Sequence, residues 1–451
     1  MSYPRQYTTR SEFESPRRPR TARLGDASSQ LVRVSSKGAL AIVDQALFAG
    51  SNFIVSALLA RWLTVAEYGA FAIAYTGLQL LFALHASCTT EPMMVYGPSR
   101  FAASERRYLA SSSWLALALA VGFSAALWIA AIFVFTASDK LLAIAFLSMA
   151  VAAPAILVQR FLRSAFYMRL EPLGAVAGGS LYLGFTLALL LLAHIYGALS
   201  LALGALIMGV ASVASALFFL SRLRPSTHTV GPTVRDVSAV HWTYSRWSLP
   251  TAVLTFVPGN LCYFLLPVWG GLAGTAQLQA SMNLVLPILH TNGALAMLVV
   301  PSLVRTRSQH GESAMIRRAW QAFILLAGMS VAYLGLLLIL GQRFADWFYQ
   351  GKYTDLGFTL LLAGLLPLTG AAVTILAGVA RAYERPREVF WSYLAASGFA
   401  STVGIVLLWQ FDLIGAFLGL LGASIITSLS LIARLRTQRL AATEPKTDLD
   451  S

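Results

Sequence analysis

The chain has 451 residues, of which 57% are hydrophobic and only 12% are charged. A soluble domain carries about 25% charged residues, so the composition excludes an ordinary water-facing surface. A net charge of +14 also occurs in nucleic-acid-binding proteins. Its distribution along this chain, described below, indicates orientation in a membrane instead, and we expect no nucleic-acid partner.

Long apolar runs recur along nearly the whole chain after residue 36, which is the pattern of a polytopic helical membrane protein. Backbone groups in lipid must be hydrogen-bonded within their own segment, so each run is expected to be a helix. The predicted fold is an all-α polytopic membrane protein with about 12 transmembrane helices in two six-helix bundles. The predicted spans lie near residues 38–60, 70–96, 113–136, 141–160, 174–195, 198–221, 247–268, 276–300, 320–340, 357–380, 389–409 and 413–433.

A long basic connection in the middle of the chain divides it into two halves. Residues 1–35 are rich in Arg, Ser and Pro and lack an apolar core, which predicts a disordered basic cytoplasmic tail close to anionic lipid. The remaining segments are predicted to be an N-terminal six-helix bundle, a cytoplasmic linker, a C-terminal six-helix bundle and a second cytoplasmic tail, at residues 36–221, 222–246, 247–434 and 435–451.

Positive charge is divided unequally between alternate connections. Of the 33 Lys and Arg residues, all but four fall on one side of the predicted topology. By the positive-inside rule, that side and both termini are cytoplasmic. The longest connection on the other side, residues 341–355, has no room for a catalytic domain, so we do not expect an enzyme. The four exceptions are Arg61, Lys140, Arg343 and Lys352.

The two halves also share a weak internal repeat. A shift of 207 residues places "RWLTVAEYGAF" on "VWGGLAGTAQL", so that Trp62 matches Trp269 and Ala66 matches Ala273. Further along, "RSAFYMRLEP" is similar to "RAYERPREVF". Six helices per half preserve the orientation, so the repeats are predicted to be parallel, with a substrate path between the halves.

The stretch "GALAIVDQALFAGSNFIVSALLARWLTVAEYGAFAIAYT", residues 38–76, resembles the first two helices of polysaccharide flippases, including O-antigen flippases. These belong to the multidrug, oligosaccharidyl-lipid and polysaccharide exporter superfamily. The similar features are the polar first helix, the exit "ARWL", "EYG" at the start of the second helix, and the basic "RFLRSAFYMRLEP" after the fourth. The second half, with "WGGLAGTAQLQA", lacks the "EYG" element.

The resemblance implies a flippase in the bacterial cytoplasmic (inner) membrane that moves lipid-linked oligosaccharide, a sugar on polyprenyl pyrophosphate, by rocking its two halves. It implies a role in polysaccharide or lipopolysaccharide biosynthesis. The implied partners are the lipid-linked oligosaccharide, membrane lipid and, as further candidates, a polysaccharide polymerase and ligase. No cofactor and no metal ion is expected.

The first span carries polar residues that lipid would not tolerate. A charged residue in a span costs roughly 2.5–3.5 kcal/mol on insertion scales, so it must face protein or water. Asp44 and Asn52 lie on one helical face with Phe48 and Ser51. Asp44 is a candidate for binding a coupling cation or a sugar hydroxyl. The alternatives are a hydrogen bond between helices or pairing with a buried arginine.

The second and eighth spans carry polar residues at matching depth. The 207-residue shift places Asn292 on His85 and Asn283 on Thr76. A cavity between the two halves would need polar groups at such positions, so His85, Asn283 and Asn292 are candidates for its lining.

Two further residues of the second half are candidates for the same cavity. His290 lies near the helical face of Asn283, although a lone histidine is more often a satisfied core residue. Asn260 lies in "FVPGN", where Pro258 either breaks the helix and frees carbonyl groups for ligands or produces a plain kink.

Four arginines lie near the predicted cytoplasmic mouth. The guanidinium group matches the geometry of phosphate, so we consider these residues as contacts for a pyrophosphate headgroup. The competing interpretation is ordinary topology charge. Glu91 either pairs with a loop arginine or belongs to a gate. The four arginines are Arg160, Arg163, Arg381 and Arg385.

The sequence holds no GxxxxGK[ST], HExxH or GxSxG motif. Transport would therefore be driven by an ion gradient, the membrane potential or mass action. The main alternative is a multidrug or cation antiporter of the same superfamily, although such proteins tend to carry more acidic residues in their helices than Asp44 and Glu91. A lipid II flippase usually has more than twelve helices, and a membrane polysaccharide polymerase or ligase usually needs a larger outer loop.

Overall fold

The computed structural model describes residues 22–136, 139–353, 356–383 and 385–443. All regular secondary structure in these residues is helical, which confirms the predicted all-α fold. The first half contains α1 (Ala22–Trp62), α2 (Val65–Cys88), α3 (Thr90–Arg100), the 3₁₀ turn η1 (Ala102–Ser104), α4 (Glu105–Thr136), α5 (Lys140–Met168), α6 (Pro172–Ile195) and α7 (Leu201–Leu223). The second half contains α8 (Val234–Tyr349), α9 (Gly357–Ala382), α10 (Pro386–Phe399), the π-helical segment η2 (Ala400–Gly404) and α11 (Ile405–Thr443).

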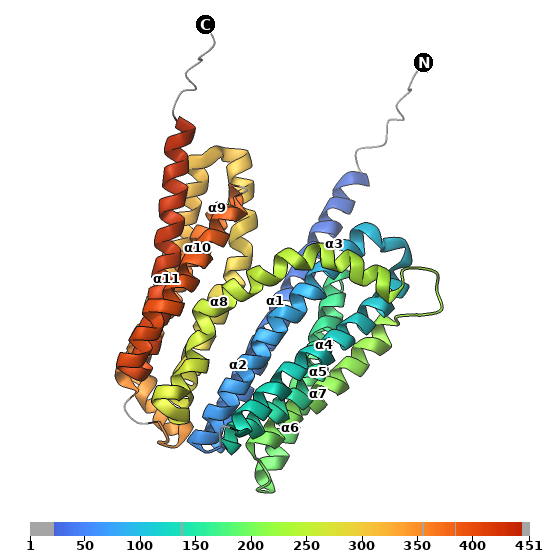
Figure 1. The fold of residues 1–451 in the computed structure, drawn as a ribbon. Helices are drawn as coiled ribbons and strands as arrows, with labels where there is room; N and C mark the ends of the chain where they lie inside the picture. Colours follow the sequence, from blue (N-terminus) through green and yellow to red (C-terminus); the bar gives the residue numbers. More distant parts are fainter. Residues whose placement is uncertain (1–21, 137–138, 354–355, 384, 444–451) are drawn as a thin grey trace, which may run out of the picture.

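Three residues reverse the chain inside the longest helical stretches. Gly271 (φ 65°) and Gly311 (φ 81°) interrupt α8 and divide it into a first, second and third pass, residues 234–270, 272–310 and 312–349 (Figure 1). Positive φ is accessible to glycine because it has no Cβ. Asp412 (φ 46°) interrupts α11 in the same way. Ten described stretches are long and apolar enough to cross a membrane, and the breaks at Gly271 and Asp412 each divide one of them, which is consistent with about 12 spans.

Several helices continue beyond the apolar runs from which the spans were predicted. The expected irregular tail is helical from Ala22, while residues 1–21 and 444–451 lie outside the described residues. Extending a helix that already exists avoids the cost of nucleating a new one. The expected linker becomes α8 at Val234, where Thr233 and Asp236 form a capping box. Most importantly for function, α5 continues through the expected basic loop to Met168.

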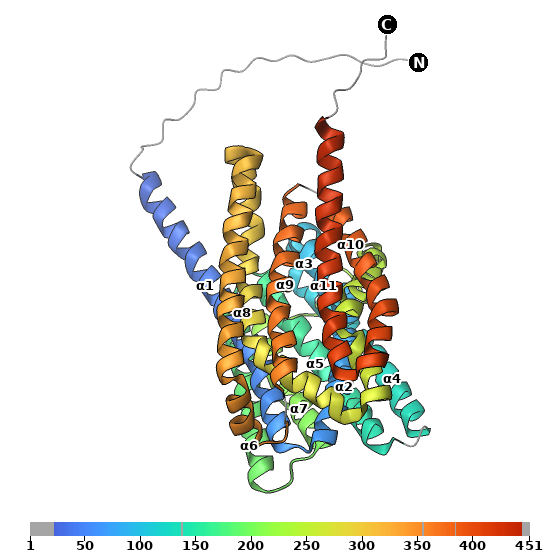
Figure 2. The ribbon, with the colours of Figure 1, turned by 90° about the vertical axis from the view of Figure 1, so that its left-hand side faces the viewer.

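The helices form two groups (Figure 1). Helices α1 to α7 lie on one side and α9 to α11 on the other, while α8 begins beside α3 and α4, where His241 bonds to Tyr108, and then crosses over to α9. We call α1 to α7 the first bundle, and the remainder of α8 with α9 to α11 the second bundle. The ribbons lie close together at the end that contains the turn between α1 and α2. They diverge towards the end at which α1 begins and α11 ends (Figures 1 and 2). We call these the opposite end and the terminal end.

The "EYG" element accounts for the contact between the bundles at the opposite end. Glu67 completes a capping box with Thr64 that starts α2. Gly69 then lies directly against the backbone of α8, because a Cβ on Gly69 would be 2.0 Å from the carbonyl oxygen of Leu272. The absence of a side chain at Gly69 therefore allows the two bundles to touch.

Substituting Gly69 tests this contact. We expect Gly69→Ala to destabilise the purified protein by at least about 1 kcal/mol, because backbone must move to admit the methyl group. Gly50→Ala is the matched control, since a Cβ on Gly50 meets nothing within 4 Å and should stabilise the helix by roughly 0.5–1 kcal/mol. Thermal unfolding in detergent measures both, and equal shifts for the two variants would contradict the predicted contact.

Candidate functional site

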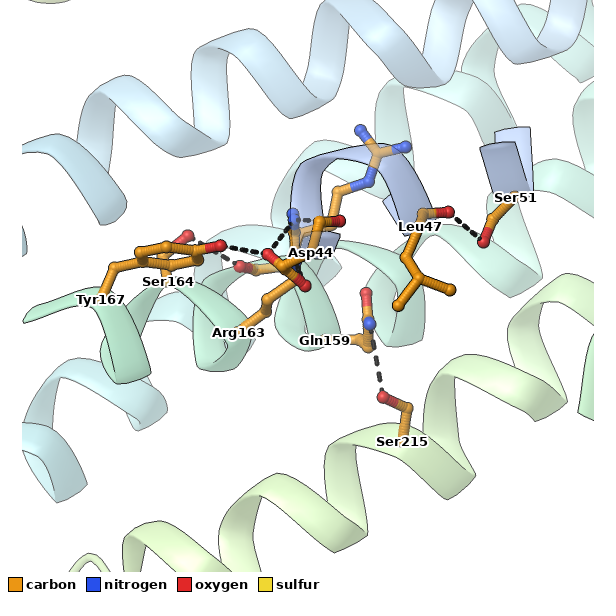
Figure 3. A network of polar contacts seen from close by, with 9 residues as sticks. Asp44, Leu47, Ser51, Gln159, Arg163, Ser164, Tyr167 and Ser215 are labelled. Atoms are coloured by element: carbon orange, nitrogen blue, oxygen red, sulfur yellow. Dashed lines mark hydrogen bonds and ion pairs between the residues drawn. The ribbon is translucent and has the colours of Figure 1, made fainter. Parts of the chain in front are cut away.

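The polar residues of α5 meet Asp44 of α1 inside the first bundle (Figure 3). Gln159, Arg163 and Tyr167 follow each other at intervals of four residues, so they share one face of α5. Figure 3 shows this face turned towards α1, with Gln159 reaching on to Ser215 of α7. The continuation of α5 through the expected loop is what places Arg163 and Tyr167 inside the bundle.

Asp44 is fully buried and bound on two sides by α5. The Nε of Arg163 donates to one carboxylate oxygen at 3.2 Å, and a terminal nitrogen of Arg163 forms an ion pair with the other oxygen. The hydroxyl of Tyr167 also donates to the carboxylate. Of the alternatives considered for Asp44, pairing with a buried arginine is therefore the arrangement observed.

Arg160 lies three residues before Arg163 on α5 and is also buried, with 7% of its surface exposed. It donates to the side-chain oxygen of Gln79 at 3.2 Å. Its guanidinium carbon lies 4.3 Å from the ring centre of Phe82 and 5.1 Å from that of Phe48, as in cation–π contacts. No carboxylate among the described residues lies within ion-pair distance of Arg160. The cluster thus holds two guanidinium groups and one carboxylate.

A small cavity of about 20 Å³ lies between these groups. Asp44, Arg160 and Arg163 line it together with Asn52 and Ser212. The hydroxyl of Ser212 is buried without a hydrogen-bond partner in the described residues. A polar space of this size has room for about one water molecule, so the cavity in this conformation is far too small for a headgroup.

The other predicted residues of the first bundle are held within that bundle. Asn52 accepts a hydrogen bond from the hydroxyl of Tyr75 at 3.2 Å. His85 is buried, with Nε2 2.9 Å from the carbonyl oxygen of Ala116 and Nδ1 3.3 Å from the Thr89 hydroxyl. His85 thus ties α2 to α4 and does not face the second bundle.

Asn283 joins the two bundles. Its amide group donates to the hydroxyl of Tyr68 at 2.8 Å, and its oxygen accepts from Ser56 at 3.0 Å. Ser56 and Tyr68 are 2.8 Å apart, which closes a ring of three buried hydrogen bonds. Gln279 adds a fourth contact to the Asn283 oxygen at 3.1 Å. The ring links α1 and α2 to the second pass of α8.

Asn292, His290 and Asn260 occupy three different environments. Asn292 donates to Ser330 at 3.0 Å within the second bundle, which mirrors His85 in the first. His290 is half-buried in α8 and makes no hydrogen bond with the described residues. Asn260 bonds to the carbonyl of Phe256 in its own helix. The structure therefore does not bring these residues together into one cavity.

The proline at position 258 does not free a carbonyl for a ligand. The helix continues past Pro258, whose missing N–H leaves the carbonyl of Leu254 without its helical partner. The hydroxyl of Ser397, on α10, donates to that carbonyl at 2.9 Å. The local consequence is therefore a contact between α8 and α10.

The remaining predicted residues are not part of the buried cluster. Arg381 is exposed, and Arg385 lies half-buried with its guanidinium carbon 5.9 Å from the ring centre of Tyr383. Glu91 accepts a hydrogen bond from Ser248. No arginine among the described residues forms an ion pair with Glu91.

A lysine on the opposite end adds a second connection between the bundles, which the sequence did not reveal. Lys352 donates to the carbonyl oxygens of Arg61 at 2.5 Å and Leu63 at 2.7 Å, which are unpaired acceptors at the end of α1. The guanidinium carbon of Arg61 lies 5.6 Å from the ring centre of Phe348 and 5.9 Å from that of Trp347. Two of the four cations assigned to this side thus hold α1 to the second bundle.

Several further residues were not identified from the sequence, including some that bond to Asp44, to Asn52, to Arg160 or to Asn283. Gln159 and Tyr167 lie four residues before and after the predicted Arg163, and this interval was the available signal for both. Tyr68 stands inside "EYG" but was treated only as part of a family resemblance. Gln79, Tyr75 and Lys352 carry no pattern that distinguishes them.

Removing the two members of the Asp44–Arg163 pair separately and together tests whether they act as a unit. Removing one partner of a buried pair costs about 3–5 kcal/mol, because it leaves an uncompensated buried charge. We expect Asp44→Asn and Arg163→Gln to destabilise the protein strongly, and the double variant to cost clearly less than their sum. Chemical unfolding in detergent measures the cycle, and additive effects would contradict the pairing.

Replacing Lys352 tests the connection at the opposite end. Lys352→Met leaves the last carbonyls of α1 unpaired, and we expect faster hydrogen–deuterium exchange in residues 58–71. Arg343→Met is the matched control, because Arg343 is an exposed cation on the same side with no described partner. Unchanged exchange in Lys352→Met, or an equal change in the control, would contradict the role of Lys352.

A scan against protein-family models and a search of curated proteins both find no match. Solved structures do match. An inward-facing "multidrug resistance MATE family transporter of the MOP superfamily" has a TM-score of 0.65 and 15% identity, covering 90% of this chain and 99% of that chain. An outward-facing MATE structure has a TM-score of 0.61 and 12% identity, covering 90% and 96%.

A third matching structure is that of a MOP superfamily transporter from Pyrococcus furiosus, with a TM-score of 0.60, 15% identity, and coverage of 90% and 96%. Its description states that "reverse polarity of binding pocket suggests different function". Similarity at this level of identity establishes the fold. The chain is a multi-pass membrane protein with the fold of the MATE transporters of the MOP superfamily.

Proposed function

We propose that this chain is an alternating-access transporter that moves lipid-linked oligosaccharide, a sugar on polyprenyl pyrophosphate, across the bacterial cytoplasmic membrane. The terminal end of the bundles faces the cytoplasm in this proposal, in accordance with the distribution of Lys and Arg. The solved structures of similar fold are described as transporters, which supports the general class.

The observation that carries the choice of substrate is Arg160. A buried guanidinium without a carboxylate is costly, since the neutral oxygen of Gln79 and two aromatic rings replace only part of its hydration. Arg163 is already neutralised by Asp44. The cluster therefore has one excess positive charge. A phosphate oxygen that binds to Arg160 would neutralise this charge, with the geometry that guanidinium groups prefer.

The small cavity implies that the headgroup binds only after a movement. Phe48 of α1 covers both guanidinium groups, with its ring centre 4.5 Å from the Arg163 carbon and 5.1 Å from the Arg160 carbon. A displacement of Phe48 with its helix would expose both arginines at once. In this step, phosphate binding is coupled to a displacement of α1, and such coupling between substrate binding and conformation is what alternating access requires.

The two ends of the molecule support the same cycle. The ring of Ser56, Tyr68 and Asn283 and the cap provided by Lys352 hold the bundles together at the opposite end. The ribbons diverge at the terminal end (Figure 1). In this proposal the conformation is open to the cytoplasm, and the opposite end must release these contacts for the sugar to leave.

A second candidate function is a multidrug or cation antiporter. The matching structure described as a multidrug resistance transporter favours this alternative, and so does the presence of a buried carboxylate, Asp44. The arrangement of charge argues against it, because an organic cation would have to displace Arg163 from Asp44 and would then lie beside Arg160.

Complementation of a flippase-deficient bacterial strain tests the main proposal. The wild-type chain should restore polysaccharide export, and lipid-linked intermediates should leave the inner leaflet. Arg160→Gln should reduce export about ten-fold or more at equal protein level, since a hydrogen bond to a charged group contributes roughly 1.5–3 kcal/mol. Arg106→Gln, which removes an exposed arginine, is the matched control and should behave as the wild type.

The two functions predict opposite results in a parallel dye-efflux assay. The flippase proposal predicts no efflux of organic cations from cells that express the chain. Efflux that persists in Arg160→Gln and disappears in Asp44→Asn at equal levels of folded protein, together with failure to restore export, would establish the antiporter and refute the flippase.

A further inference from the structure

The second bundle contains a large apolar groove that the transport proposal does not use. The groove has a volume of about 380 Å³, against about 20 Å³ for the cavity beside Asp44. The third pass of α8, α9 and α11 form its walls near the terminal end, and Figure 2 looks onto this side of the bundle. Its walls include Trp320, Phe323 and Leu376, and Arg436 stands among the lining residues.

The surroundings of the groove are those of a surface in contact with hydrocarbon. On α8, the neighbouring residues Ile324 and Leu325 are 64% and 56% exposed, and on α11 Leu429 is 57% exposed. The ring of Trp320 is itself 60% exposed and meets Phe323 edge-on, with ring centres 5.6 Å apart. An apolar hollow within an apolar, exposed surface of a membrane protein is filled by a lipid chain and not by water.

The charge at the end of the groove indicates the headgroup. Arg436 is exposed and has no ion-pair partner among the described residues. No carboxylate among the described residues pairs with Arg436: Glu312 accepts from the hydroxyl of Tyr383, a groove-lining residue, at 2.7 Å, and Glu388 pairs with Arg434 at 3.5 Å. A positive group at the level of the headgroups, next to an apolar hollow, is complementary to an anionic lipid.

We propose that this groove binds one acyl chain of an anionic phospholipid from the leaflet at the terminal end, with the lipid phosphate on Arg436. The lipid is a resident of the second bundle and not the transported substrate. Figure 1 places α9 and α11 on the side of the molecule away from α5, which carries the proposed pyrophosphate contacts. The site is therefore independent of the proposed function.

Trp320 provides the measurement. The purified full-length protein is placed in detergent with phosphatidylglycerol or phosphatidylcholine that carries brominated acyl chains, which quench nearby tryptophan fluorescence. The difference between the wild type and Trp320→Phe isolates the signal of Trp320. We expect half-maximal quenching at an about five-fold lower mole fraction of phosphatidylglycerol than of phosphatidylcholine, which corresponds to one favourable arginine–phosphate contact.

Variants separate the headgroup contact from the groove. Arg436→Gln should abolish the preference for phosphatidylglycerol, while Arg318→Gln, at an exposed position of α8 that does not line the groove, should retain it. Ala372→Phe should fill the groove and reduce quenching by both lipids. Equal quenching by the two lipids in the wild type, or an unchanged preference in Arg436→Gln, would overturn the proposal.

Competition identifies the occupant. Unbrominated phosphatidylglycerol should restore the fluorescence of Trp320 at a lower mole fraction than polyprenyl phosphate does. If polyprenyl phosphate competes more strongly, the groove is a site for the carrier lipid and the assignment to a phospholipid is wrong. Because the assay uses no transport, its result does not depend on the outcome of the complementation experiment.

Discussion

A guanidinium group inside a membrane bundle must be compensated, and in the part of the chain that the structure describes the buried cluster of the first bundle holds two guanidinium groups beside one carboxylate. Arg163 is compensated by Asp44, whose carboxylate also accepts a hydrogen bond from Tyr167, and α5 must extend to Met168 for this to occur. Arg160 is supported by Gln79 and by the faces of two phenylalanine rings. Insertion of an additional charge is costly in lipid, and this cost is the basis for the proposed anionic substrate.

The contacts between the two bundles at the opposite end are linked to this cluster through α1. At the opposite end, Gly69 allows α2 to touch the backbone of α8, and Asn283 completes a ring of hydrogen bonds with Ser56 and Tyr68. Buried polar contacts of this kind are stable only while every member is satisfied, so loss of one member of the ring weakens the contact between the bundles. Asp44 and Ser56 of the ring both belong to α1, which therefore connects the charge cluster to the opposite end.

The number of helices and the fold class were accessible from sequence because apolar run length and the division of arginines are each strong signals. The end of α5 was not. In "RFLRSAFYM" the polar residues look like a basic loop, and only the position of Asp44 on a different helix makes a buried helical arrangement favourable. Likewise, Asp44 and Asn283 were identified as polar residues in apolar spans, but their tyrosine partners were not, since Tyr167 and Tyr68 act through contacts with residues distant in sequence.

The central claim is that the first bundle contains an anion site with Arg160 as its uncompensated group. Direct binding measured by native mass spectrometry tests it, with polyprenyl pyrophosphate and a permanent organic cation as competing ligands for the purified protein. The account predicts that the pyrophosphate lipid binds the wild type and binds Arg160→Gln at least about ten-fold more weakly, while the cation binds neither. Preferential binding of the cation, or pyrophosphate binding that is unaffected by the substitution, would contradict it.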